Sequence, residues 1–472
     1  MRSTAAVEGS LPCRCTRWLR KAFSLRCRLL APVWLPIFFR PHLDSPSSLW
    51  DAGFPPPILA LRLRLCQTKE NPTRTRKVSV VLALLSALFA LAALFTSQPA
   101  AAQTEKVLRS FPQNLYPGGL IADSAGNLYG ITVAAGNSCS GSDCGTVFEL
   151  SPAAGGGYTE KILYSAFSRY NTNGWNPAAG VALDAAGNLY GTTSAGGTYG
   201  NGVLFKLTKS GSSYTETVLH SFGGDGDGAQ PLSVPVVAGA GNIYGTTLEG
   251  GAHADGTVFE LSPKAGGGYT YKLIHSFNGN DGALPYGNLV RDAAGNLYGI
   301  TTISNTSNGT AFELSPGTGG TWTENVFFYF TVAPSAGLTA DGAGNFFGTT
   351  GYGGVNNAGS VFQLTLASGV WTQQTICSFC SESGCADGDG PVGVVLDSTG
   401  NLYGSTYAGG AYSLGTACKL SPATGGAWTY NGLHTFGNGA DGANPLGVVL
   451  GPGGKLYGVT FYGYGTVFEI NP

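Results

Sequence analysis

Short stretches in which apolar and polar residues alternate follow one another along residues 104–472, and clusters of glycine separate them. Such alternation places every second side chain on one face, so each stretch predicts a half-buried β-strand. One stretch, "AGNLYGTTSAGG" from Ala186 to Gly197, recurs in seven close copies. The copies define a unit of about fifty residues, and one aromatic position marks its register: Tyr129, Tyr190, Tyr244, Tyr298, Phe347, Tyr403 and Tyr457.

Each unit contains four predicted strands, named A to D in chain order. Residues 179–184 are typical of strand A, 188–193 of strand B, 145–150 of strand C and 104–111 of strand D. The repeats begin with a lone strand D and end just after a strand C, so the first strand can complete the last unit. Four antiparallel strands per unit are typical of a β-propeller blade. The sequence therefore predicts an all-β fold, a seven-bladed β-propeller over residues 103–472 whose ring is closed by the N-terminal strand joining the last blade. A β-helix is the weaker alternative, because it needs shorter coils.

The turn between strands A and B follows the pattern Asp-x-x-Gly-Asn, with Asp123, Asp184, Asp292, Asp341 and Asp397 in first place. We expect each carboxylate to accept backbone N–H groups inside its turn, while the glycine supplies a positive φ. Strand C places a phenylalanine at one recurrent position, where the sixth unit has Cys418. This position predicts packing between neighbouring sheets, so Cys418 is expected to be a buried, unreactive thiol.

The combined pattern "SF..GDG..P...L..D..GNLYGTT..GG....GTVFELSP..GG.YTE" recurs across residues 104–472. It resembles the GloVer tandem repeat of secreted bacterial proteins described as choice-of-anchor proteins. The resemblance implies an exported repeat protein. The signatures of kelch and WD propellers are absent from the sequence, so their functions are not carried over.

Composition and charge narrow the choice of ligand. Charged residues make up 11% of the chain and glycine 74 of its 472 residues, which fits short strands joined by glycine turns. Residues 1–102 hold 14 of the 25 Lys and Arg but 4 of the 27 Asp and Glu, which leaves residues 103–472 with a net charge of −12. Because nucleic acid binding depends on basic surface, nucleic acid is excluded as a partner of the repeats.

Residues 77–102 have the pattern of a signal peptide. Basic residues up to Lys77 precede an apolar run at 78–95, and Ala100 and Ala102 occupy the small positions before Gln103. Cleavage there would leave no membrane span in the mature chain and predicts a secreted, periplasmic or cell-surface location. The apolar run is 18 residues long, so an uncleaved anchor is the alternative. Residues 1–76 lack strand alternation and are interpreted as a disordered extension or the product of a start assigned too far upstream.

The D-to-A and B-to-C connections share one face of a propeller and vary most between units, as expected of loops that carry function on a rigid scaffold. The candidate ligand-binding residues are the aromatic residues assigned to these connections: Tyr116, Tyr170, Trp175, Tyr199, Tyr352, Tyr407, Tyr412, Tyr462 and Tyr464. Aromatic rings beside Asn, Asp and backbone groups suit sugars or extended peptides, so a polysaccharide or a surface protein is the expected partner. The alternative is that these rings pack over glycine backbone.

Six aspartates in the D-to-A connections form a candidate calcium site: Asp225, Asp227, Asp281, Asp387, Asp389 and Asp441. Closely spaced carboxylates and carbonyls in glycine-rich loops suit Ca²⁺. Because no loop supplies six oxygen ligands, a structural role in tight turns is the favoured alternative, and no other cofactor is predicted.

Histidine and cysteine add two expectations. One strand D position carries His220, His275 and His434 in three units and Arg109, Tyr164, Phe328 and Cys377 in the others, which predicts a packing position and no converging metal ligands. Two local disulfides, Cys139–Cys144 and Cys380–Cys385, are expected in a chain bound for an oxidising compartment.

The sequence contains no Gly-x-Ser-x-Gly elbow and no paired-His metal motif, so no catalytic residue is predicted. The hypothesis that fits best is an exported, monomeric binding or interaction module, with a glycan or cell-surface polymer as ligand. Two alternatives stay open: an extracellular glycan-active hydrolase or lyase whose site is assembled from separate blades, and a structural protein of the cell envelope.

Overall fold

The computed structural model describes residues 105–472 except 113–114, 134–144, 168–171, 225 and 463–464. All described residues belong to one unit of the chain, Ala87–Pro472. The predicted extension at 1–76 and signal peptide at 77–102 lie outside them. No helix in the described part of the chain is long and apolar enough to cross a bilayer.

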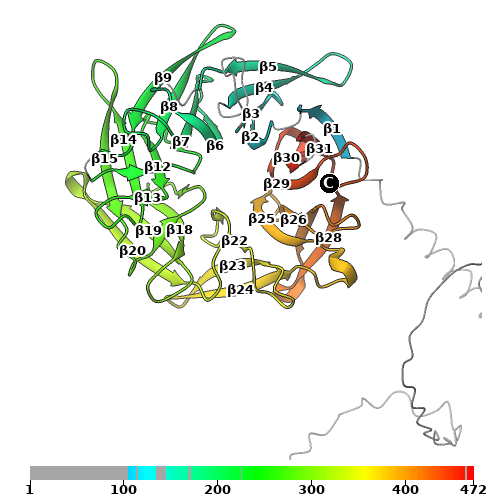
Figure 1. The fold of residues 1–472 in the computed structure, drawn as a ribbon. Helices are drawn as coiled ribbons and strands as arrows, with labels where there is room; N and C mark the ends of the chain where they lie inside the picture. Colours follow the sequence, from blue (N-terminus) through cyan, green and yellow to red (C-terminus); the bar gives the residue numbers. More distant parts are fainter. Residues whose placement is uncertain (1–104, 113–114, 134–144, 168–171, 225, 463–464) are drawn as a thin grey trace, which may run out of the picture. The chain divides into compact units, whose positions relative to one another are not determined.

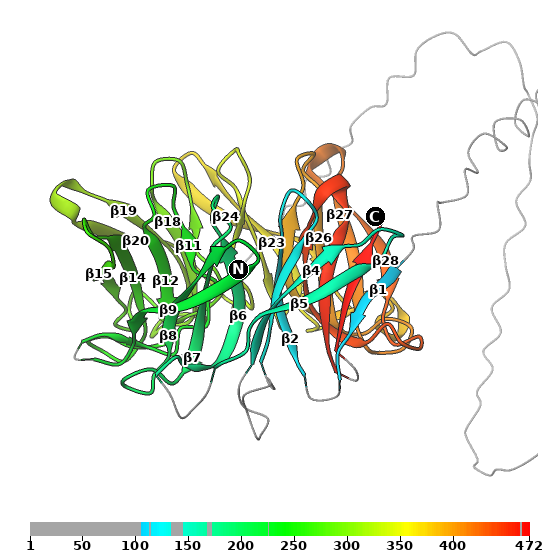
Figure 2. The same cartoon turned by 90° about the horizontal axis from the view of Figure 1, so that it is seen from above.

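Antiparallel four-stranded sheets form seven blades around a ring, which confirms the predicted seven-bladed β-propeller (Figure 1). The A strands lie nearest the ring axis and the D strands at the periphery. Viewed from the side, the strands of each blade run between the two faces of the ring (Figure 2).

The first three blades follow the predicted strand order A to D. Blade 1 comprises β2 (Pro117–Ala122), β3 (Leu128–Thr132), β4 (Thr146–Pro152) and β5 (Tyr158–Tyr164). Blade 2 comprises β6 (Trp175–Leu183), β7 (Leu189–Ala195), β8 (Val203–Ser210) and β9 (Ser213–Ser221). Blade 3 comprises β11 (Val236–Val237), β12 (Ile243–Thr247), β14 (Thr257–Pro263) and β15 (Tyr269–Ser276). Two short strands, β10 (Gly228–Ala229) before β11 and β13 (Glu249–Gly250) after β12, pair with each other.

Blades 4 to 6 repeat the order, with some short A strands. Blade 4 splits strand A into β16 (Ala283–Pro285) and β17 (Val290–Arg291), followed by β18 (Leu297–Ile303), β19 (Thr310–Pro316) and β20 (Trp322–Tyr329). Blade 5 comprises β21 (Thr339–Ala340), β22 (Phe346–Thr350), β23 (Ser360–Ala367) and β24 (Val370–Ser378). Blade 6 comprises β25 (Asp389–Leu396), β26 (Leu402–Ala408), β27 (Thr416–Pro422) and β28 (Trp428–Thr435). Single 3-10 turns lie at Thr318–Gly320, Ser383–Cys385, Thr424–Gly426 and Pro452–Gly454.

Blade 7 joins the two ends of the repeat region. It contains β29 (Ala443–Leu450), β30 (Leu456–Tyr462) and β31 (Thr466–Ile470), and its outer strand is β1 (Glu105–Ser110). Strand β1 pairs antiparallel with β31, with Val107 opposite Phe468 and Ser110 opposite Thr466. The predicted closure of the ring by the N-terminal strand is therefore confirmed.

The core lies between neighbouring blades. A phenylalanine at the end of each D strand is buried and, at six of the seven junctions, its ring contacts the strand C phenylalanine of the next blade. For example, the ring centroids of Phe222 and Phe259 lie 5.0 Å apart. At the remaining junction Phe379 faces the blade that carries Cys418, and both side chains belong to one buried cluster. The strand C position therefore packs blades together, as the sequence predicted.

Candidate functional site

The D-to-A and B-to-C connections lie on one face of the ring, named here the loop face, and the A-to-B and C-to-D turns lie on the opposite turn face. On the loop face, the residue before the strand A proline donates its N–H to the B-to-C connection of the preceding blade. Gln230 bonds the Asn201 carbonyl, Leu284 that of Asp255 and Asn444 that of Leu414, each at 2.8–2.9 Å. All three donors have positive φ of 53–58°. These bonds hold the connections of neighbouring blades together at three junctions.

The turn face is occupied by the Asp-x-x-Gly-Asn turns. In blade 2 one Asp184 oxygen accepts the N–H groups of Ala186 and Asn188, both at 2.9 Å, and the other accepts the Tyr190 hydroxyl at 3.0 Å. Burial acts to raise the pKa of Asp184, but the bonds from Asn188, Tyr190 and Ala186 hold it below its usual value. These carboxylates therefore have the structural role that their pattern predicted.

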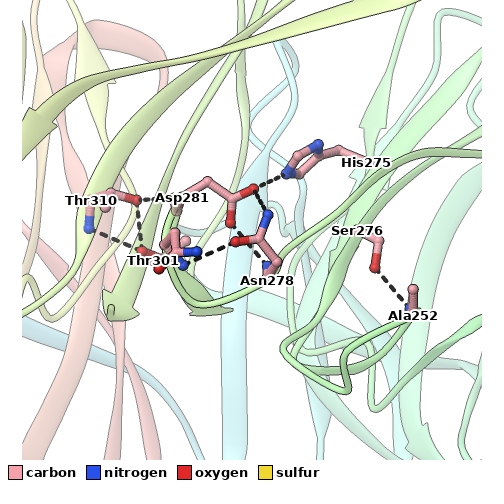
Figure 3. Close-up of polar contacts among 8 residues, drawn as sticks. Ala252, His275, Ser276, Asn278, Asp281, Thr301 and Thr310 are labelled. Carbon is pink, nitrogen blue, oxygen red and sulfur yellow. Dashed lines mark hydrogen bonds and ion pairs between the residues drawn. The ribbon is translucent and has the colours of Figure 1, made fainter. Parts of the chain in front are cut away.

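Three histidines at the end of strand D each bond an aspartate of the following loop (Figure 3 shows the His275 pair). The Nε2–Oδ2 distances are 2.7 Å for His220–Asp227, 3.2 Å for His275–Asp281 and 3.0 Å for His434–Asp441. Burial alone would raise the pKa of Asp227, but the bond from His220 holds it below its usual value. The strand D position that the sequence assigns to packing therefore also forms a His–Asp pair in three blades.

The strand D position on its own predicts packing and not these pairs, because the partner of each histidine lies in the next connection. The units with histidine in strand D all carry aspartate six or seven residues later, whereas the units with Arg109, Tyr164 and Phe328 do not. That covariation between repeats was the available signal. Each pair belongs to a different blade, so the three pairs do not converge on one reacting centre.

Residues of this D-strand position also meet the D strand of the next blade. Arg109 forms a 2.7 Å ion pair with Glu160, and the His220 ring stacks on Tyr271 with centroids 4.1 Å apart. At two junctions the neighbour is a half-buried glutamate, Glu105 beside Asp441 and Glu324 beside Asp281. The Oε1 atom of each glutamate is buried without a hydrogen-bond partner among the described residues. Burial first, and the neighbouring aspartate second, raises the pKa of both glutamates to about 7.

Because the pKa of both glutamates is raised, we expect the free energy of unfolding to fall as the pH rises. The pKa of each glutamate in the folded state lies above the 4.5 of an exposed glutamate. The protonated glutamates therefore contribute fully to the stability of the fold below about pH 4.5, and this contribution is lost as the pH rises through about 7. After allowance for solvent screening, Glu324→Gln is expected to stabilise the protein by about 1 kcal/mol at pH 8 and little at pH 5. The measurement is the melting temperature of wild type and variant from pH 5 to 8.

His275 sets the control for this prediction. Burial lowers its pKa from 6.5, so its contribution is present above pH 6.5 and is lost as the pH falls. Because His275 is present in both proteins, its contribution cancels when variant and wild type are compared at each pH from 5 to 8, and the difference that remains reports the glutamate. The exposed Glu382→Gln serves as the matched variant, and an equal response of Glu324→Gln and Glu382→Gln to pH would contradict the prediction.

Tyrosines stand exposed on the loop face. The exposed fractions are 59% for Tyr199, 71% for Tyr352, 37% for Tyr407, 47% for Tyr412 and 50% for Tyr462. Partial burial and a hydrogen bond with Tyr462 raise the pKa of Tyr407, so these two rings lie together at the junction of blades 6 and 7. Next to them Phe461 contacts Tyr462 and stacks on Tyr116, with centroids 4.9 and 4.7 Å apart.

The remaining aromatic candidates differ in placement. Trp175, assigned to a loop from sequence, is the first residue of β6 and pairs with Ala195, because strand A of blade 2 begins earlier than predicted. Tyr407 likewise lies in β26, one residue before its end, and Tyr462 is the last residue of β30. Tyr170 and Tyr464 lie outside the described residues.

The described aspartates of the candidate calcium site lie in four different D-to-A connections, and four of them accept protein hydrogen bonds: Asp227, Asp281, Asp387 and Asp441. Asp281 accepts from His275 and from the N–H of Asn278, and the buried Asp387 accepts from the Ser381 N–H and hydroxyl at 2.9 and 2.6 Å. Asp389 begins β25, opposite Ala408. Among the residues that the structure describes, no group of three or more His, Cys, Asp or Glu is arranged to hold a metal ion. Asp225 lies outside them.

The cysteines agree with expectation where they are described. Cys380 and Cys385 form a disulfide, and Cys139 and Cys144 lie outside the described residues. Cys418 is buried, and burial raises the pKa of its thiol to about 12. The predicted burial of Cys418 is therefore confirmed, and a thiol with a raised pKa is expected to react slowly.

Comparisons with known proteins concern the repeat and the ring. The model of a family described as the Gloeobacter/Verrucomicrobia repeat matches residues 116–333 and 309–472. No curated protein matches the chain in sequence.

Two similar structures are of one enzyme. They are a catalytically inactive variant of virginiamycin B lyase from Staphylococcus aureus with quinupristin, 10% identical, and the selenomethionine-substituted enzyme, 11% identical. Each match covers 78% of this chain and 99% of that chain with a TM-score of 0.51. A gluconolactonase from Xanthomonas campestris, 12% identical, matches 78% of this chain and 89% of its own with a TM-score of 0.39. At these identities the likeness to the lyase shows the fold alone.

Proposed function

The chain belongs to the Gloeobacter/Verrucomicrobia repeat family, and from this premise we propose that it is an exported binding module whose loop face holds a glycan or cell-surface polymer. The observation that carries the proposal is the set of exposed tyrosines on that face, above all Tyr407 and Tyr462 beside Tyr116 and Phe461. Tyrosine offers a large apolar face and a hydroxyl at low entropic cost, which suits stacking on sugar rings.

The braced loops support a binding role. A ligand loses less affinity to loop ordering when the surface is already held in place, and the bonds between neighbouring connections supply that order. The His–Asp pairs add to this order, because each aspartate of a D-to-A connection also accepts a backbone N–H of its own connection.

Replacement of both Tyr407 and Tyr462 by alanine tests the proposal. Each ring is expected to contribute about 1 kcal/mol, so the double variant should bind a polysaccharide about 30-fold more weakly than wild type. The measurement is isothermal titration with the polysaccharide that wild type binds best, with and without Ca²⁺.

The matched control is Tyr329→Ala. Tyr329 is 50% exposed, as Tyr462 is, but lies on the outer strand β20. Equal affinity of the double variant and wild type would defeat the loop-face proposal. Turnover of a polysaccharide would favour the alternative of a glycan-active hydrolase or lyase, and the absence of any ligand would favour a structural protein of the cell envelope.

A further inference from the structure

A groove of 1210 Å³ opens on the turn face between blades 4 and 5. Its walls include Tyr298, Phe327 and Phe346 from blades 4 and 5, together with Leu366 and Trp371 from the β23–β24 hairpin. The groove is larger than the roughly 300–1,000 Å³ of most small-molecule pockets, so it suits an extended ligand of several units. It lies away from the loop-face tyrosines, since it is built from the opposite ends of the blades.

The repeats provide a baseline against which this junction stands out. The position of Phe327 is aliphatic in the other six units: Leu108, Leu163, Leu219, Ile274, Ile376 and Leu433. The position of Phe346 is also aliphatic in the other six: Leu128, Leu189, Ile243, Leu297, Leu402 and Leu456. Both substitutions occur at one junction, where they line the same groove.

The aromatic side chains form one continuous wall. The ring centroid of Phe327 lies 4.7 Å from that of Trp371, and the Phe346 centroid lies 4.8 Å from Tyr298 and 5.7 Å from Trp371. Tyr298 is half-buried, whereas its six equivalents in the other blades are at most 5% exposed. At the hairpin tip Leu366 and Val370 are 52% and 62% exposed. The ring at this repeat position is thus left partly uncovered at this junction, whereas the equivalent rings of the other six blades are covered.

Polar groups edge this wall. Asp292 and Glu313 accept the Tyr298 hydroxyl at 3.2 and 3.1 Å, and Arg291 and Asp341 line the same groove. Carboxylate and guanidinium groups beside an aromatic wall can bond hydroxyls while sugar rings stack on the wall. Three carboxylates and one guanidinium leave an excess negative charge, which disfavours anionic polymers.

We propose that the groove between blades 4 and 5 binds an uncharged oligosaccharide, with sugar rings stacked on Phe327 and Trp371 and hydroxyls bonded by Arg291, Asp292 and Glu313. This site is separate from the loop-face site, and the protein can therefore hold two glycan segments on opposite faces of one ring.

Titration of the full chain with cellopentaose, xylopentaose, laminaripentaose and chitopentaose, and with oligogalacturonate as the anionic probe, tests this site. The informative variants are Phe327→Leu with Phe346→Leu, which restore aliphatic residues of the repeat and so preserve the fold, and Trp371→Ala. We expect at least one neutral probe to bind and each of these variants to weaken it at least tenfold. Trp428→Ala is the matched control, because Trp428 holds the equivalent position at the next junction, 5.9 Å from Phe347.

The two glycan sites are separated by a second comparison. Replacement of Tyr407 and Tyr462 is expected to leave the affinity of the groove for oligosaccharide unchanged. If this variant loses all binding while the groove variants keep it, the proposed groove site is wrong and the ligand binds the loop face. The groove is also overturned if no neutral probe binds, if oligogalacturonate binds in preference, or if the Phe→Leu double variant and Trp371→Ala both keep wild-type affinity.

Discussion

Deletion of residues 105–111 is expected to lower the melting temperature by roughly 10 °C and to cause aggregation, because it removes the strand that closes the ring. Without β1, strand β31 becomes an open edge along its pairing from Thr466 to Ile470. The deletion also removes Phe111, which is 3% exposed and contacts Phe148 of blade 1 at 5.3 Å. Loss of such a buried ring alone costs about 4 kcal/mol. Scanning calorimetry and size-exclusion chromatography measure both effects.

A synthetic peptide of residues 103–112 provides the control for this deletion. Because closure is non-covalent, the peptide should pair with β31 and restore part of the lost melting temperature. Deletion of residues 1–102, which leaves β1 in place, should change little. A chain without β1 that melts as the wild type does would contradict closure by the N-terminal strand.

Phe259→Ala and Gly245→Ala are expected to destabilise the protein by about 4 and about 2 kcal/mol. Gly245 lies directly across from Phe259 in the β12–β14 pair, and an added Cβ would lie 2.5 Å from Cζ of the ring. The ring therefore covers the glycine, and this is why glycine follows the tyrosine of the repeat. Six blades share the contact: Gly130 with Phe148, Gly191 with Phe205, Gly245 with Phe259, Gly299 with Phe312, Gly348 with Phe362 and Gly458 with Phe468.

The double variant Gly245→Ala with Phe259→Ala distinguishes this contact from a general loss of stability. Without the ring, the added methyl group fills part of the vacated space, so the double variant should be no less stable than Phe259→Ala alone. Gly239→Ala is the matched control, since an added Cβ there meets no atom within 4 Å. Equal unfolding free energies of Gly245→Ala and wild type in denaturant titrations would contradict the ring–glycine contact.

The ring could be predicted from sequence because each blade is one unit of the repeat. Seven copies of a four-stranded unit predict the number of blades, and the strand D pattern that precedes the first copy identifies the strand that closes the ring. The strand A bounds were less predictable. Strand A of blade 3 has only Val236–Val237 in regular pairing, whereas strand A of blade 2 extends back to Trp175. These strands lie nearest the ring axis, and their length differs from blade to blade.

The candidate sites were predictable only in part. Exposure of Tyr199 and Tyr352 follows from their place in connections, which a repeat alignment reveals. The groove between blades 4 and 5 was not predicted, because Phe327 and Trp371 belong to different blades and meet only when the blades stand side by side. Alignment of the seven units distinguishes Phe327 and Phe346, because the other six units have aliphatic residues there. A residue that differs from the repeat is not explained by the structure that all blades share.

The central claim is that the loop face of an exported propeller holds a glycan, and a glycan array probed with the full chain, with and without Ca²⁺, tests it most directly. We predict specific binding of a glycan that the Tyr407→Ala, Tyr462→Ala variant weakens about 30-fold and that Tyr329→Ala keeps. Binding that requires Ca²⁺ would assign a role to the loop aspartates, and binding without it would assign the affinity to the tyrosines. No binding in either condition would contradict the account.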